Sequence, residues 1–209
     1  FNANVTKLFG CQFIIVMTFL TEAIILKKSH LGDFDRQYFL LTKELGKIKV
    51  LAKSANKINS KLAAHLEPFS LSLLMIAPGK SLFRLAAAKN IQPNKAISSD
   101  FLKIILSSVF FEAVDLLLAN QQRDQLVFAL AKKYLQEISI SANTKDSIIT
   151  LNRHLFELLL ITGYKPRLTC QSQRQLVALM IKTIEEATDK QVRSFDFLHL
   201  FHLFFLSLF

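Results

Sequence analysis

The chain has 209 residues, of which 51% are apolar and 20% are charged. This balance excludes an intrinsically disordered protein, and the length allows one good-sized domain or two small ones, each with its own core. The net charge is +10, so the partners to expect are polyanions such as nucleic acid or an anionic membrane surface.

Residues 1–16, FNANVTKLFGCQFIIV, do not begin with Met and make a poor signal peptide, because they lack a small-residue cleavage site. A fragment and a start site placed too far upstream both stay open, and we expect 1–16 to be an extra segment. At the other end, FLHLFHLFFLSLF is thirteen residues long, short of the ~20 that a membrane-spanning helix needs. We expect a packed terminal helix there, with 199–209 as an apolar tail.

The excess charge lies almost entirely in one segment. Residues 17–95 hold 13 basic and five acidic residues, a net of +8, whereas residues 96–209 hold 12 and 11, a net of +1. A segment with this field attracts polyanions. We therefore expect a nucleic-acid-binding domain over 17–95 and an electrostatically ordinary domain over 96–198.

Short apolar runs separated by turn residues predict strands between residues 20 and 85. The runs TEAIIL, QYFLLT and IKVLAK have strand length, and LSLLMIAPGKSLFRLAAA continues the pattern. Gly32, Gly46 and the Pro78–Gly79 pair mark the turns. A small antiparallel barrel or a sandwich fits this pattern.

After Pro93 the apolar residues recur at intervals of three and four, which predicts helices that pack on one another. Ser99 or Asp100 can cap the first of them. The expected fold is therefore α+β, a β-module followed by an all-α helical bundle. The expected helices are FLKIILSSVFFEAVDLLLAN, QRDQLVFALAKKYLQEIS, TKDSIITLNRHLFELLLITG and QSQRQLVALMIKTIEEATDK.

No catalytic or cofactor site is predicted. The PGKS sequence at 78–81 imitates a phosphate-binding loop, but Leu74 stands where that loop needs glycine. Asp33 and Asp35 flank Phe34 in a turn, where carboxylates more often cap and solvate than catalyse.

No metal site is predicted either. His199 and His202 have helical spacing but only Asp196 beside them, and Cys11 and Cys170 lack metal-ligand spacing. Two isolated cysteines favour a reducing cytoplasm.

A lysine series runs through GKIKVLAKSANKINSKL, residues 46–62. On a strand, side chains alternate between faces, so the first lysines lie opposite Ile48 and Val50. One face is core and the other is cationic, a surface that can lie along a phosphate backbone, although a solvated lysine face is the alternative. The series comprises Lys47, Lys49, Lys53, Lys57 and Lys61.

The same module holds three more cations, Lys27, Lys28 and Arg36, and two rings, Phe34 and Tyr38. Rings beside cations are the combination with which single-strand-binding barrels stack unpaired bases.

Residues 21–70 resemble the N-terminal domain of the RecO family of DNA-repair recombination mediators. Three elements carry the resemblance: a Gly-acid-x-Asp-Arg turn, a Thr-x-x-x-Gly-basic-hydrophobic hairpin, and a Leu-x-Pro-Phe element. ITGYKPRLTC and RSFDFL resemble later parts of the family, so the similarity extends over 18–198. The matching residues are Gly32, Asp33, Asp35 and Arg36; Thr42, Gly46, Lys47 and Ile48; and Leu66, Pro68 and Phe69.

The resemblance implies an OB-fold followed by a helical domain, in a non-catalytic protein without a cofactor. It implies binding and annealing of single- and double-stranded DNA, and help in loading recombinase on strands coated with single-strand-binding protein (SSB), in the RecF pathway. The implied partners are RecR and the SSB C-terminal tail, with no membrane, in the cytoplasm at the nucleoid.

Three departures qualify the resemblance, and one of them is that the two apolar ends extend beyond the limits of the family. The family has Gly and then a basic residue where this chain has Ser54 and Asn56, which alters the loop and one phosphate contact. Only Cys170 stands where many members begin a zinc module, so no structural zinc is expected. The alternative function is a membrane-surface or structural interaction protein with a basic β-module.

Overall fold

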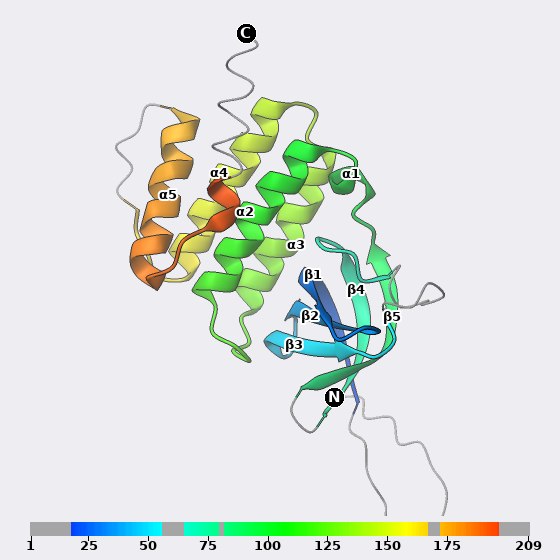
Figure 1. Ribbon diagram of the computed structural model, residues 1–209. Helices are drawn as coiled ribbons and strands as arrows, with labels where there is room; N and C mark the ends of the chain where they lie inside the picture. Colours follow the sequence, from blue (N-terminus) through cyan, green and yellow to red (C-terminus); the bar gives the residue numbers. More distant parts are fainter. Residues whose placement is uncertain (1–17, 56–64, 80–81, 167–171, 197–209) are drawn as a thin grey trace, which may run out of the picture. The chain divides into compact units, whose positions relative to one another are not determined.

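The computed structural model describes residues 18–55, 65–79, 82–166 and 172–196. The chain divides into two compact units, one ending at Pro93 and the other beginning at Asn94. The first is built of strands and the second of helices (Figure 1). The predicted α+β class is confirmed.

The strands close into a barrel in the order β1-β2-β3-β5-β4. Neighbours pair antiparallel except β3 and β5, which are parallel. This confirms the OB-fold barrel and excludes the sandwich that the residue pattern left open. The strands are β1 (Phe19–Leu31), β2 (Asp35–Thr42), β3 (Gly46–Ala52), β4 (Leu71–Ala77) and β5 (Phe83–Gln92).

The β2–β3 turn explains the Thr-x-x-x-Gly spacing. The Thr42 hydroxyl donates to the Gly46 carbonyl at 2.8 Å and accepts from the Leu45 N–H at 3.0 Å. Gly46 has a φ of +66°, a left-handed conformation that glycine adopts without a Cβ clash. The turn therefore fixes the hairpin register, in which Thr42 lies opposite Gly46.

The barrel core is formed by alternate residues of each strand. Tyr38 and Leu40 of β2 and Ile48 and Val50 of β3 point inward. Each fully buried aliphatic side chain of this kind stabilises the fold by ~1.5–3 kcal/mol. The residues between them, at 39 and 49, are consequently on the outer face.

The helices of the second unit begin at polar caps. The Asp100 carboxylate accepts from the N–H groups of Leu102 and Lys103, which confirms it as the predicted cap. Asp124, Asn143 and Ser172 cap the next three long helices in the same way. The helices are α1 (Lys95–Ser98), α2 (Phe101–Leu117), α3 (Gln125–Ile140), α4 (Thr144–Ile161) and α5 (Gln173–Thr188), and α4 contacts α2, α3 and α5 (Figure 1).

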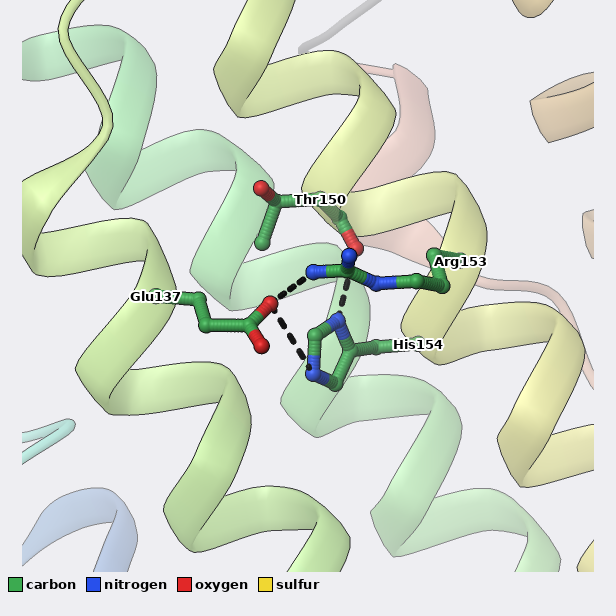
Figure 2. Close-up of polar contacts among 4 residues, drawn as sticks. All are labelled: Glu137, Thr150, Arg153 and His154. Atoms are coloured by element: carbon green, nitrogen blue, oxygen red, sulfur yellow. Dashed lines mark hydrogen bonds and ion pairs between the residues drawn. The ribbon is translucent and has the colours of Figure 1, made fainter.

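The helical core contains ionisable and aromatic side chains. Phe110 stacks on Tyr134 with ring centroids 4.1 Å apart, and His154 meets both rings edge-on. His154 is fully buried, and its Nδ1–H donates to the Thr150 carbonyl at 2.8 Å. Figure 2 shows its Nε2 facing Glu137, 3.6 Å away, while Arg153 pairs with the same carboxylate.

Candidate nucleic-acid interface

The outer face of the barrel carries a row of three side chains across β1, β2 and β3. Lys27 lies opposite Phe39, and Phe39 lies opposite Lys49. The ammonium nitrogens of Lys27 and Lys49 lie 4.5 and 5.3 Å from the centre of the Phe39 ring. The three side chains form what we call the Lys–Phe–Lys row.

A β-bulge places Lys27 in this row. Ile25 lies opposite Leu40 and Lys27 lies opposite Phe39, so β1 has one extra residue, Leu26, at this point. In a regular strand without the bulge, strict alternation would put Lys27 on the same face as Ile25, which is in the core. The bulge therefore turns Lys27 to the outer face of the barrel.

The row combines charge with an aromatic surface. Both lysines are exposed and Phe39 is half-buried. An ammonium group over an exposed ring contributes about 0.5–1 kcal/mol, so each contact orders a lysine without fixing it strongly. The row thus places two partly ordered lysine side chains and one aromatic side chain on the outer face of the barrel.

The end of β3 adds a further cation. Lys53 is exposed on a turn, and the N–H of Ser54 in that turn donates to the Asp35 carboxylate at 2.8 Å. Asp35 thus has the capping role predicted for it. Ser54 has a φ of +55°, so the position where the family has glycine needs a left-handed backbone here as well.

The first turn of the barrel carries Phe34, which is 58% exposed. Gly32 in the same turn has a φ of +68°. The structure thus leaves this predicted stacking ring on the surface, at the β1–β2 turn.

Lys28 lies opposite Tyr38 on the neighbouring strand, and Arg36 lies two residues before Tyr38 on β2. The Lys28 ammonium pairs with the Glu67 carboxylate at 2.7 Å. Burial raises the pKa of Tyr38, and the nearby Arg36 guanidinium partly offsets this effect. The Arg36 guanidinium is therefore close enough to influence the pKa of Tyr38, and Lys28 already has a counterion.

Two of the predicted contact residues are not on the surface. Tyr38 is 1% exposed because it points into the barrel core, so the prediction that it stacks on bases is wrong for this structure. Lys47 is 8% exposed and lies opposite the buried Leu41, which corrects its assignment to the solvent face. Lys57 and Lys61 lie outside the described residues.

Phe39 was not among the predicted contact residues. The sequence QYFLLT contains two adjacent rings, Tyr38 and Phe39, and only Tyr38 was predicted to stack on bases. The hairpin register held a usable signal, since pairing Thr42 with Gly46 also pairs Phe39 with Lys49.

Among the described residues there is no group of three His, Cys, Asp or Glu side chains placed to hold a metal ion. Cys11, Cys170, His199 and His202 lie outside the described part of the chain. Within the same described ranges, no helix is both long and apolar enough to cross a membrane.

Residues 17–94 match the family model described as "Recombination protein O N terminal". The chain is also similar to curated proteins named DNA repair protein RecO over about 150 residues. The chain belongs to the RecO family.

The RecO of Roseiflexus sp. (strain RS-1) is 30% identical over 71% of this chain and 51% of its own length. The RecO of Dehalococcoides mccartyi (strain 195) is 33% identical over 72% of this chain and 58% of its own length. The RecO of Thermoanaerobacter sp. (strain X514) is 27% identical over 71% of this chain and 59% of its own length. The chain thus spans between half and three fifths of these RecO proteins.

Proposed function

We propose that this RecO relative is a DNA-binding recombination mediator of DNA repair. In this proposal it binds single- and double-stranded DNA, anneals complementary strands and helps load recombinase on SSB-coated strands. The observation that carries the proposal is the Lys–Phe–Lys row on the outer face of an OB-fold barrel. This is the face that OB-folds use for oligonucleotides.

The chemistry of the row suits a polyanion. The Lys27 and Lys49 ammonium groups lie on the two strands that flank β2 and both contact its Phe39 ring, so they form a short line of charge. Lys53 extends the cationic surface at the end of β3. Each phosphate that a lysine neutralises releases a counterion, which favours binding at low salt.

The partners that we propose are RecR and the SSB C-terminal tail, with the SSB tail on the helical unit. The even charge balance of residues 96–209 supports a protein partner for that unit, since nucleic acid favours the basic segment. We further propose that the protein acts without catalysis and without a structural zinc, at the nucleoid. Elemental analysis after dialysis against chelator is expected to find less than stoichiometric zinc.

Salt titration of DNA binding tests the interface. Replacing Lys27 and Lys49 together by Gln should reduce the slope of log affinity against log salt by about 1.4 for single strands, at ~0.7 per phosphate contact. Affinity should fall similarly for all sequences, because phosphate contacts carry no base information. Fluorescence anisotropy with labelled oligonucleotides measures both quantities.

The matched control is the double variant Lys89→Gln and Lys190→Gln, which removes two exposed lysines elsewhere. Its slope should stay close to that of the unchanged protein. If the two double variants lose the same slope, net charge alone explains binding and the row is not the interface. An unchanged slope in the Lys27 and Lys49 variant would place the DNA elsewhere.

A further inference from the structure

We infer that Phe39 is a base-stacking platform that gives this interface its preference for unpaired strands. The inference rests on the proposed function and adds to it a residue that distinguishes single strands from duplex. The lysines on either side would hold phosphates of the same strand, and the ring would hold a base.

The position of Phe39 supports this role. It lies on the central strand of the β1–β2–β3 face, and its neighbours Tyr38 and Leu40 fill the core. Phe39 is therefore the large side chain that β2 directs outward in the middle of the cationic row. A half-buried ring in this place contributes less to the core than a buried one, and its outer part stays open to a ligand.

The two ammonium groups contact the Phe39 ring in the unbound protein and can leave it when DNA binds. In the unbound protein they lie over Phe39 at 4.5 and 5.3 Å from its centre. An incoming strand offers each ammonium a phosphate oxygen, a partner with full negative charge. When the lysines turn toward the phosphates, the aromatic face becomes available to a base.

Base stacking on a protein ring requires a base with an open face. In a single strand any base offers one, so stacking tolerates all sequences. In a duplex the faces are covered by neighbouring base pairs, and only the phosphates are accessible. The ring therefore adds affinity for single strands alone, whereas the lysines add affinity for both.

The test compares Phe39→Leu with the unchanged protein on three probes of equal length: a single strand, a duplex, and a single strand with abasic sites throughout. Phe39→Leu should lose ~5- to 150-fold in affinity for the single strand, the equivalent of ~1–3 kcal/mol per stacked base. Its affinity for the duplex and for the abasic strand should stay within about twofold, as phosphate contacts are unaffected. Phe39→Tyr, which retains the ring, should restore single-strand affinity.

Phe34→Leu is the matched control, since it removes another exposed ring of the same unit. A larger loss from Phe34→Leu than from Phe39→Leu would move the platform to the β1–β2 turn and overturn the inference. Equal losses of Phe39→Leu on all three probes would indicate a structural role and also overturn it. If the unchanged protein binds none of the probes, the proposed function itself fails; normal binding with no effect of Phe39→Leu refutes only the platform.

Discussion

The barrel and the helical unit use the same kinds of side chain in opposite ways. In the barrel, Lys27 and Lys49 are exposed over the half-buried Phe39. In the helical unit, the buried Lys103 donates to backbone carbonyls, and the buried His154 packs against two rings. We therefore propose a binding role for these side chains in the barrel and a packing role in the helical unit, and the surroundings of each residue distinguish the two.

The largest effect should come from exchanging the ring in each unit for alanine. Phe110 is fully buried and stacked on Tyr134, so Phe110→Ala should lower the free energy of unfolding by about 3–5 kcal/mol. Phe39→Ala should cost about 1 kcal/mol or less, since it removes only cross-strand contacts on an outer face. Urea unfolding followed by circular dichroism compares the two. Similar losses of unfolding free energy in the two variants would contradict the difference between the buried ring and the outer ring.

The next largest effect should come from replacing the buried Lys103 and the exposed Lys49. The Lys103 ammonium donates to the carbonyls of Ser139 and Ser141, at the C-terminal end of α3, where a cation is favoured. Lys103→Met should therefore cost about 1–3 kcal/mol of stability and leave the salt dependence of DNA binding unchanged. Lys49→Met should instead reduce the salt dependence of DNA binding, with a stability change of ~0.5 kcal/mol or less. The same two measurements on both variants decide this, and a salt slope altered by Lys103→Met would contradict the division of roles.

A smaller effect should appear with pH, through His154. Burial lowers the pKa of this imidazole below its ordinary value of 6.5. Glu137, 3.6 Å from Nε2, favours the charged form, but Arg153 already pairs with that carboxylate. Lys133 also disfavours the imidazolium and Glu157 favours it, and both are smaller effects than burial.

The sign of the pH effect follows from proton uptake. Below pH 6.5 the unfolded chain takes up a proton at His154 that the folded chain does not. Stability from this group is thus complete above pH 6.5 and falls as the pH is lowered from there toward the folded pKa. Urea midpoints of the unchanged protein and of His154→Gln, measured across this window, should converge as the pH falls. A midpoint difference that does not vary with pH would show that His154 has the same pKa in both states.

The sequence predicted the parts of both units that local chemistry determines. Gly46 was predicted to mark a turn, and the structure gives it the left-handed backbone that favours glycine there. Asp100 is a cap for a similar reason, since its carboxylate accepts the first N–H groups of α2. Such features depend on residues close together in the chain, so a single sequence contains them.

The exposure of the proposed contact residues was predicted less well, because it depends on which face each strand turns inward. Tyr38 and Phe39 are adjacent, and alternation says only that they point in opposite directions. The bulge at Leu26 reverses the alternation of β1, which changes the face of Lys27. The exposure of Lys47 depends on what covers the outer face around it, which strand periodicity does not specify.

The smallest effect should come from the turn that carries Lys53. Ser54 has a φ of +55°, a conformation that costs a residue with a Cβ about 1–2 kcal/mol. Ser54→Gly should raise stability by about 0.5 kcal/mol, since relief of this strain exceeds the added flexibility of the unfolded chain. The hydrogen bond to the Asp35 carboxylate should persist, because its donor is the backbone N–H of residue 54.

Gly46→Ala is the opposite change at a φ of +66° and should cost about 1 kcal/mol in the same urea experiment. A stabilised Ser54→Gly variant with normal DNA affinity would show that the turn needs the left-handed conformation and not the serine hydroxyl, whereas a loss of affinity would give that hydroxyl a contact with DNA.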